Sequence, residues 1–457
     1  MDSEQSELFV KELVSKARAA QQVFEGYSQQ QVDAVVRAIA KAIFDNAEPL
    51  ARMAVDETRM GVYGDKVNKN KGKARVIWND LKGKKSVGVI RECPEEGIIE
   101  VAKPMGVVGA VTPTTNPIVT PMCNAMFALK GRNAIIICPH PRAKKCSAEA
   151  VRLMKDAACK LGAPEDIIQI IAEPTVELSG LVMKLCDVCI STGGMGMVRA
   201  AYASGKPAFG VGAGNVQCLV DEGVDIEKAV PMIIEGRRFD NGIICSGEQT
   251  CIMPAKDYDR IVAEFVKDGA YYVSDPAMVL KLRETLFPGG VMDKNIVGQS
   301  ADFVAEKAGI PAPKGTKVLL VKAPGYGRDD LYAKEKMCPV IAAYAYDKWE
   351  DGVAIALANL NVEGKGHSVC IHSNNDAHIR YAAEVLPVSR FLLNQICATS
   401  NGGSFFNSLS ATTTLGCGSW GNNSISENLS WKHLFNVSRI AAVRPGSRMP
   451  SDEEIWG

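Results

Sequence analysis

The segment from Phe239 to Thr250 contains the residue best suited to nucleophilic chemistry, Cys245. This cysteine follows the apolar pair 243–244 and precedes Ser246 and Gly247, small residues at which a strand or loop can pass into a helix. A free thiol has a pKa of about 8.5, and a helix N-terminus lowers that value toward neutrality. The pattern therefore predicts a nucleophilic cysteine at the start of a helix. The alternative is a buried structural thiol, which is the commoner use of cysteine among apolar residues.

A second segment has the composition of a nucleotide-binding turn. Thr192, Gly193 and Gly194 follow an apolar stretch and precede a helical pattern. In that arrangement the backbone amides at the helix N-terminus can approach a pyrophosphate. A plain strand-to-helix connection has the same residues, so the two interpretations stay open. The Gly-rich run 210–215 has no strand pattern before it and does not fit the GxGxxG fingerprint.

The elements that must position these groups follow from hydrophobic periodicity. Residues 4–60 show apolar stripes at helical spacing, and residues 86–101 read as a short hairpin with a turn at 93–97. From residue 107 the pattern alternates strands and helices, which predicts a parallel sheet covered by helices on both faces. The expected strands cover residues 107–111, 133–138, 167–171, 188–191, 317–321 and 340–346, and the expected helices cover residues 147–161 and 176–184.

Composition sets the broad class of the chain. At 457 residues it exceeds the size at which one core stops growing, so two domains are expected. Basic and acidic residues number 52 each, which argues against a nucleic-acid partner. No apolar run reaches the roughly 18 residues of a membrane span, and the charged N-terminus has no signal-peptide core, so a cytoplasmic location is expected.

Fourteen scattered cysteines in a chain of this length are expected to be reduced thiols. The CxxC at 186–189 has no second pair at zinc spacing, so no metal is predicted.

Seven motifs resemble, in order, those of the aldehyde dehydrogenases that transfer their product to coenzyme A. They are Thr112–Pro117, Cys138–Lys145, Ser191–Gly194, Gly210–Asn215, Phe239–Gln249, Glu335–Val340 and Thr414–Gly421. The resemblance extends from Val101 to about Arg444, which is nearly the whole chain. Residues 113–122 and 453–457 are most similar to the CoA-dependent succinate-semialdehyde dehydrogenases.

The resemblance implies roles for individual residues. Cys245 would attack the aldehyde carbon, and the Asn116 side-chain amide with the backbone N–H of Cys245 would form the oxyanion hole. Each such donor commonly contributes about 2.7–4 kcal/mol. Loss of a hydride to the nicotinamide would leave a thioester on Cys245. Glu335 would hydrogen-bond the nicotinamide ribose, and Thr192–Gly194 with Gly212 would line the cofactor site. Without the resemblance, Asn116 is a turn residue before proline and Glu335 a surface carboxylate.

The Gly210–Asn215 motif differs from that of hydrolytic relatives, which carry there a glutamate that activates water. This chain has only glycine, valine, alanine and asparagine at that place. Water is then a poor acceptor of the acyl group, and a thiol such as coenzyme A is expected. Glu248, three residues after Cys245, would project away from it on a helix, so we expect a structural role there.

Binding and activation of coenzyme A have two candidate segments. His140, Pro141 and Arg142 open a basic run directly after a strand and offer donors to its adenosine diphosphate or to the 2′-phosphate of NADP. A solvated surface run is the alternative. His367 lies between glycines and a strand and can deprotonate the thiol, because imidazole titrates near neutrality. A structural histidine is the alternative there.

The identity of the acyl group depends on which side chain binds the distal anion of the aldehyde, and the sequence does not identify that side chain. Succinate semialdehyde needs a cation or amide cluster for its carboxylate, sulfoacetaldehyde needs one for its sulfonate, and acetaldehyde needs neither. The candidates are Arg142, Arg199, Arg390 and the amide-rich segment Asn394–Asn407.

These observations predict an α/β aldehyde dehydrogenase fold. A dinucleotide-binding domain is expected at residues 1–236, a catalytic domain at 237–430 and an oligomerisation tail at 431–457. The hairpin 85–103 and a last strand at 436–443 resemble the oligomerisation elements of the superfamily, in which the tail adds to a neighbour's sheet. The resemblance, together with the marginal stability of a lone exposed hairpin, implies a homo-oligomer. The expected reaction interconverts a short aldehyde and its acyl-CoA with NAD or NADP. Succinate semialdehyde is the first candidate, and sulfoacetaldehyde and acetaldehyde are the alternatives.

Two rival functions differ in class. A hydrolytic dehydrogenase needs a general base near Cys245, and the sequence shows none there. A nucleotide-binding scaffold that has lost catalysis is disfavoured, because Cys245 and Asn116 are both present.

Overall fold

Four helices open the chain in the computed structural model, which describes residues 2–457. They are α1 (Ser3–Glu25), α2 (Gln29–Asp45), α3 (Ala47–Thr58) and α4 (Tyr63–Leu81). The first two begin at capping boxes in which Asp2 and Ser28 accept hydrogen bonds from backbone amides three residues later. Their apolar stripes pack into one core with the following sheet, as the periodicity predicts.

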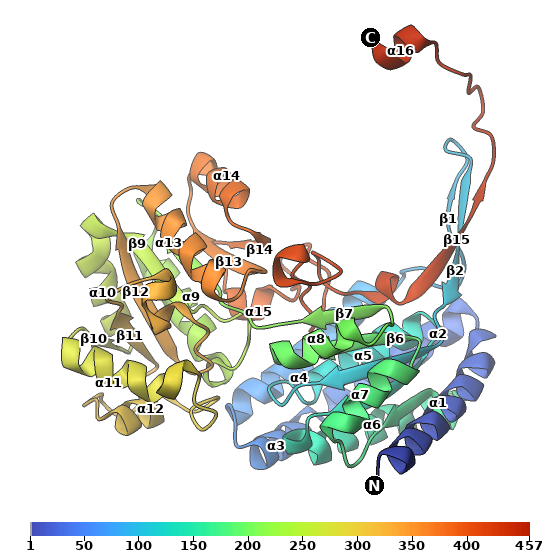
Figure 1. Cartoon of the computed structure of the whole chain (residues 1–457), viewed down its shortest axis with the longest axis horizontal. Helices are drawn as coiled ribbons and strands as arrows, with labels where there is room; N and C mark the ends of the chain where they lie inside the picture. The colour runs from blue at the N-terminus through green and yellow to red at the C-terminus, as the bar shows by residue number, and fades with distance from the viewer. Residues whose placement is uncertain (1) are drawn as a thin grey trace.

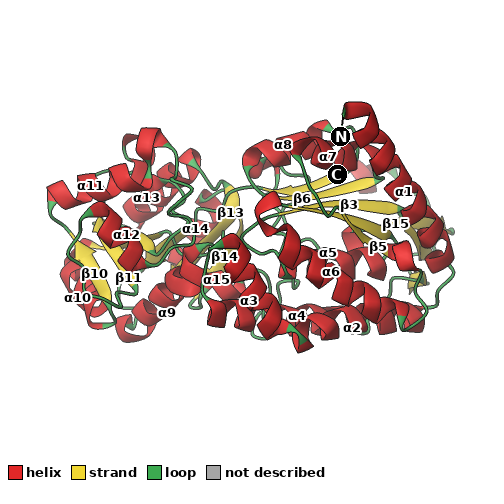
Figure 2. Ribbon diagram, turned by 90° about the horizontal axis from the view of Figure 1, so that it is seen from below, coloured by secondary structure: helices red, strands yellow, loops and turns green. Residues whose placement is uncertain are grey.

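A five-stranded parallel sheet follows, with the strand order β5-β4-β3-β6-β7. The strands are β3 (Val107–Thr112), β4 (Ala134–Pro139), β5 (Ile168–Ile170), β6 (Val188–Thr192) and β7 (Ala208–Val211). The connecting helices are α5 (Val119–Lys130), α6 (Lys144–Cys159), α7 (Val176–Leu185) and α8 (Met195–Ala203). Helices α1, α7 and α8 cover one face and α2, α5 and α6 the other (Figure 2). Because the strand order reverses between β3 and β6, ligands are expected outside the carboxyl ends of these two strands.

The second half of the chain forms a seven-stranded parallel sheet, with the order β10-β11-β12-β9-β8-β13-β14. Its strands are β8 (Gln217–Val220), β9 (Thr250–Pro254), β10 (Ala270–Val273), β11 (Val318–Lys322), β12 (Val340–Tyr346), β13 (Gly366–His372) and β14 (Val388–Leu393). Its helices are α9 (Ile226–Arg238), α10 (Tyr258–Lys267), α11 (Pro276–Leu286), α12 (Ala301–Ala308), α13 (Trp349–Val362), α14 (Asp376–Val385) and α15 (Cys397–Ser400). The sheet lies beside the first one (Figure 1). The chain changes sheets between residues 211 and 217, and the domain division at residue 236 stays a prediction.

A small antiparallel sheet projects from the body beside the first domain (Figure 1). It contains β1 (Gly88–Cys93), β2 (Ile98–Pro104) and β15 (Phe435–Ala441), in that order. The last strand was expected to extend a neighbour's sheet, but within this chain it pairs along the whole of its own hairpin strand β2. The chain ends in the short helix α16 (Asp452–Trp456). Among residues 2–457, no helix combines the length and apolarity required to cross a membrane.

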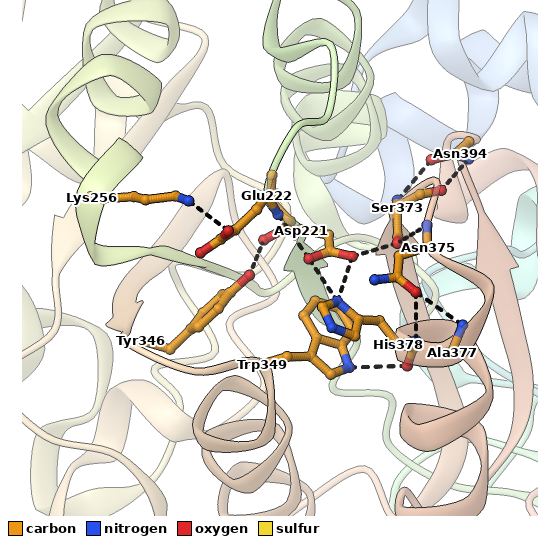
Figure 3. Close-up of polar contacts among 11 residues, drawn as sticks. Asp221, Glu222, Lys256, Tyr346, Trp349, Ser373, Asn375, Ala377, His378 and Asn394 are labelled. Atoms are coloured by element: carbon orange, nitrogen blue, oxygen red, sulfur yellow. Dashed lines mark hydrogen bonds and ion pairs between the residues drawn. The ribbon is translucent and has the colours of Figure 1, made fainter.

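A polar network fixes the carboxyl end of β8 against α14 (Figure 3). The buried carboxylate of Asp221 accepts a hydrogen bond from the Ser373 hydroxyl at 2.6 Å and lies 2.9 Å from Nδ1 of His378. The His378 ring stacks on Trp349 with centroids 5.0 Å apart, and the Trp349 indole donates to the His378 carbonyl. Nothing in the network touches Cys245, so we assign it a structural role.

Candidate active site

Cys245 lies in a turn between α9 and β9, so the expectation of a helix N-terminus at this residue is wrong. The segment before it bends sharply, because Asp240 and Asn241 both adopt left-handed φ angles of 52° and 53°. Ser246 and Gly247 let the chain turn into a strand and not into a helix. Because no helix begins at Cys245, no helix N-terminus lowers the pKa of its thiol.

The pKa of Cys245 is in fact raised, to about 12. Burial is the main cause, and the charges of Glu335 and Cys417 add to it. The Arg390 guanidinium and the cysteine's own backbone N–H oppose the rise. The residue as a whole is only half-buried, because one side of it borders a cavity. With its pKa raised in this way, Cys245 is held as a thiol near neutral pH.

Close backbone contacts bring the separate motifs together around Cys245. A Cβ atom on Gly214 would lie 1.9 Å from the Cys245 carbonyl oxygen, and one on Gly366 would lie 1.9 Å from that of Cys417. A Cβ on Gly364 would lie 2.4 Å from the Asn215 side chain. These glycines are required by packing, since any side chain would push the motifs apart.

Cys245 and Asn116 line the same cavity, which has a volume of about 340 Å³. Its wall is formed by α4, the start of α5, the Cys245 turn and the loop from residue 398 to residue 415. Asn116 lies in the turn that follows β3, so the first domain supplies one side of the cavity and the second domain the cysteine.

Lys69 of α4 holds the Asn116 amide. Its ammonium donates to Oδ1 of Asn116 at 2.9 Å and to the Asp240 carboxylate at 2.5 Å. Lys66, one turn earlier, lies 3.0 Å from the same carboxylate. Burial raises the pKa of Asp240, but the charges of Lys69 and Lys66 outweigh burial and hold this pKa below its usual range. Because the amide oxygen accepts from Lys69, the Nδ2 group points its hydrogens elsewhere: one is donated to the Thr115 hydroxyl at 3.4 Å and the other stays available.

The carboxyl ends of β3 and β6 carry the polar atoms that a dinucleotide would need. The hydroxyls of Thr112, Ser191 and Thr192 are buried and have no hydrogen-bond partner among residues 2–457. At Gly193 and Gly194 a Cβ atom would meet nothing within 4 Å, so the space before α8 is open. Buried polar atoms are normally satisfied, and these three fit a polar ligand seated at the switch point.

The other predicted cofactor residues flank this end of the sheet. His140 is exposed directly after β4 and its Nδ1 accepts from the Arg142 amide at 3.1 Å. Pro141 begins the 3-10 turn between β4 and α6. A Cβ on Gly212 would lie 2.4 Å from the sulfur of Met195, so this glycine lets the chain pass close to the start of α8. Gly210 lies in β7, so a strand does occur there, but the next element is β8 and the GxGxxG fingerprint still fails.

Glu335 lies near the cysteine, where its charge raises the Cys245 pKa. Burial raises the pKa of Glu335 itself to about 8, helped by the neighbouring Glu363 and opposed by Arg237. The Glu335 backbone N–H donates to the Glu363 carboxylate at 2.9 Å. The carboxyl that acts on the Cys245 pKa thus stands at the position that the resemblance matches to the ribose contact.

Comparison with known proteins identifies the family. The aldehyde dehydrogenase family model matches residues 3–297. The chain belongs to the aldehyde dehydrogenase family. Among curated proteins, it is 55% identical to succinate-semialdehyde dehydrogenase (acetylating) of Clostridium kluyveri, over 99% of this chain and 100% of that protein. The resemblance found in the sequence is thereby confirmed.

Solved structures agree with this assignment. An acetylating aldehyde dehydrogenase from Geobacillus thermoglucosidasius superposes with a TM-score of 0.94 and 37% identity, covering 98% of this chain and 99% of that one. A Rhodopseudomonas palustris propionaldehyde dehydrogenase, with bound CoA and an acylated cysteine, superposes with a TM-score of 0.86 and 28% identity. The match covers 95% of this chain and 97% of that one. The α/β aldehyde dehydrogenase fold is confirmed.

The structure corrects two expectations about this aldehyde dehydrogenase, the titration of His367 near neutrality and the helical position of Glu248. His367 is fully buried on β13, and burial with the nearby Arg390 lowers its pKa to about 3, so it does not titrate near neutrality. Its Nδ1 lies 3.0 Å from the Ser368 hydroxyl. Glu248 is not on a helix but at the entry to β9, where its carboxylate accepts the Cys397 N–H at 2.7 Å. Its structural role agrees with the sequence prediction, although the helical geometry behind that prediction is wrong.

None of the three predicted arginines lines the cavity. Arg390 is buried and donates to the His367 carbonyl at 2.8 Å, Arg199 is exposed on α8, and Arg142 points toward the Thr58 carbonyl at 3.4 Å. The segment 394–407 does reach the wall, through Ala398 to Ser400 and Gly402 to Phe406.

The cations on the cavity are Lys69 and Lys73, which the sequence analysis missed. Lys66, Lys69 and Lys73 recur at i, i+3 and i+7, which places three lysines on one face of α4. That spacing is the sequence signal from which these cavity lysines could have been predicted.

No metal was predicted for this aldehyde dehydrogenase, and one group of metal-ligand types does occur among residues 2–457. The ligand atoms of Cys218, Cys370 and His372 lie within 4.8 Å of one another. All three are buried in the seven-stranded sheet, on the neighbouring strands β8 and β13. The CxxC at 186–189 is not part of this group.

Proposed function

We propose that this chain is a CoA-acylating aldehyde dehydrogenase that interconverts succinate semialdehyde and succinyl-CoA. The observation that carries the proposal is the meeting of Cys245 and Asn116 on one cavity whose remaining wall is largely apolar, in a chain 55% identical to an acetylating succinate-semialdehyde dehydrogenase. Sulfoacetaldehyde and acetaldehyde stay alternative substrates.

The chain's own residues then divide the work of the first half-reaction. The Cys245 thiol loses its proton to water, and its sulfur attacks the aldehyde carbon. Nδ2 of Asn116 with the Cys245 backbone N–H stabilises the oxyanion that forms. Lys69 keeps the Asn116 amide oriented, because it occupies the amide oxygen. NAD or NADP, when bound, supplies the hydride acceptor. A thioester on Cys245 is what remains.

The dinucleotide fits the carboxyl ends of β3 and β6. Thr112, Ser191 and Thr192 offer unpaired hydroxyls, and the open turn at Gly193–Gly194 offers backbone amides at the start of α8. His140, Pro141 and Arg142 flank this end and would contact the phosphates of the dinucleotide or of coenzyme A.

Coenzyme A is the acyl acceptor in this proposal. The Gly210–Asn215 motif has no carboxylate, and a solved relative holds CoA with an acylated cysteine. The charge of Glu335 acts on Cys245, but the match of Glu335 to the ribose contact gives it a role other than a base for water. His367 is a poor thiol base in the free enzyme, because its pKa is about 3. A cytoplasmic location accords with a reaction between soluble coenzymes.

The proposal is tested by reduction of NAD+ or NADP+ by the purified protein with succinate semialdehyde, with and without coenzyme A. We expect turnover that requires coenzyme A, that disappears in Cys245→Ser, and that persists in the control Cys93→Ser, a half-buried thiol of the projecting hairpin. Equal rates without coenzyme A would mean that water removes the acyl group, and the acylating assignment would be wrong.

A further inference from the structure

Lys73 is a cation on the cavity wall with an incomplete set of partners. Its ammonium donates to the Gly402 carbonyl at 2.9 Å and to the Thr412 carbonyl at 3.2 Å. An ammonium has three donors, so one remains for a ligand. The loop is shaped to admit this group, because a Cβ atom on Gly402 would lie 2.7 Å from the Lys73 nitrogen.

The charge of Lys73 has no carboxylate partner among residues 2–457, in contrast with its neighbours on the same helix face. Lys66 and Lys69 both pair with Asp240, whereas both acceptors of Lys73 are neutral backbone carbonyls. Removing an ammonium from water without a counter-charge is unfavourable, and burial lowers the pKa of Lys73 to about 8. An anion arriving in the cavity would supply the missing charge.

The position of Lys73 relative to the reacting groups matches a short bifunctional substrate. Lys69, four residues earlier on α4, contacts Asn116, and four helical residues rise about 6 Å. Three carbon–carbon bonds separate the aldehyde and carboxyl carbons of succinate semialdehyde. The wall beside these groups includes the apolar side chains of Val76, Val119 and Ile244, which suit the methylene groups.

We propose that Lys73 is the anion-binding residue of this cavity, holding the distal carboxylate or sulfonate of the aldehyde while Cys245 reacts with its other end. The inference rests on the proposed function and names its substrate class, an aldehyde with a terminal anion. It also assigns specificity to a lysine of the N-terminal domain, outside the segment that carries the nucleophile.

The test compares kcat/KM for succinate semialdehyde, sulfoacetaldehyde and butanal at fixed coenzyme concentrations in Lys73→Met. Butanal has the same chain length as succinate semialdehyde without its charge. A hydrogen bond to a charged group is worth enough to lower kcat/KM for the anionic substrates by about 10- to 100-fold, with butanal unchanged or improved. The matched control is Lys71→Met on the same helix α4. Lys71 pairs with Glu48 of α3 and lies outside the cavity wall.

The pH dependence of the wild-type enzyme gives a second measurement that needs no variant. The groups that influence the Lys73 charge are Cys123 of α5, Lys69 and Cys245. In the ratio of kcat/KM for succinate semialdehyde to that for butanal, the ionisation of groups common to both reactions cancels. The ratio should fall about tenfold per pH unit above pH 8, as the Lys73 ammonium loses its proton.

Each outcome has a separate meaning. An equal loss for butanal and the anionic aldehydes in Lys73→Met, or a flat pH ratio, overturns the assignment of Lys73. A wild-type preference for butanal overturns the anionic substrate class but leaves CoA-dependent chemistry intact. Absence of CoA-dependent turnover with every aldehyde overturns the proposed function itself. The ratio between the two anionic aldehydes tells carboxylate from sulfonate.

Discussion

At the scale of single residues, the buried pair Lys66 and Lys69 separates a structural role from a positioning role. Both ammonium groups contact Asp240, but only Lys69 also contacts Asn116. Lys69→Met should therefore lower kcat by about 10- to 100-fold with little change in KM, because an oxyanion donor acts in the transition state. Lys66→Met should retain kcat, although either variant leaves Asp240 with one cation and should lower the melting temperature.

The measurement is steady-state kinetics of both variants, with Asn116→Ala and the double variant Lys69→Met/Asn116→Ala alongside. If Lys69 acts through Asn116, the double variant is no slower than Asn116→Ala alone. Fully multiplicative losses in the double variant, or an equal fall of kcat in Lys66→Met, would contradict the positioning role.

The residue scale also shows what a sequence can and cannot supply. The identity of Cys245 follows from its motif, but its setting does not. The left-handed residue Asp240 before it contacts Lys66 and Lys69 of α4, which lie far away in the chain. The pKa of Cys245 is raised mainly by burial, with Glu335 and Cys417 adding to the rise and Arg390 opposing it, and only the fold creates this burial and brings these groups near. The lack of a carboxylate partner for Lys73 likewise cannot be predicted from the sequence. Its two acceptors, the carbonyls of Gly402 and Thr412, lie on a loop far away in the chain.

At the scale of elements, periodicity predicted the N-terminal helices and the helices seen as α6 and α7, each of which has one face toward solvent. Helices α9, α10 and α14 also have an exposed face and were not predicted. Helix α5 went unnoticed because all twelve of its residues are buried, so no polar face marks it. Six strands of the two parallel sheets were predicted from apolar runs, but β7, β8, β9, β10, β13 and β14 were not, and the order of the strands came only with the structure.

The network at the end of β8 allows a test of an element without touching catalysis. Val216 bridges to Glu248 near Cys245, and Asp221 lies five residues further along, about 16 Å away in a strand. Asp221→Ala removes a buried carboxylate that accepts from Ser373 and contacts His378. It should lower the free energy of unfolding by about 3–5 kcal/mol, because the groups left behind lose their partner.

Denaturant unfolding followed by circular dichroism measures this change. The control is Asp225→Ala, whose exposed pair with Lys228 should contribute less than about 1 kcal/mol. Activity per folded molecule should be unchanged in both variants. A loss of kcat in fully folded Asp221→Ala would show that the network serves the active site after all.

At the scale of the whole molecule, the projecting sheet is too exposed to be explained by a single chain. Strand β1 is a free edge, and β15 carries Ile440 with 58% of its surface exposed. Strand pairs with little core behind them are marginal in water, and free edges tend to pair with other chains. Since β15 completes its own hairpin, we propose that the oligomer forms by contacts between whole three-stranded sheets and not by exchange of the last strand.

Ile440→Asp tests this proposal, because a carboxylate on the exposed face of β15 should oppose burial against a second chain. Light scattering coupled to size exclusion should show an oligomer for the wild-type chain and a shift toward the monomer for Ile440→Asp, increasing on dilution. The control Val291→Asp alters an exposed valine of the seven-stranded domain and should leave the mass unchanged.

The two cavity-forming domains are complete in one chain, so the monomeric variant should keep measurable CoA-dependent activity. A monomeric wild-type protein would contradict the oligomer, and an unchanged mass in Ile440→Asp would move the interface away from β15.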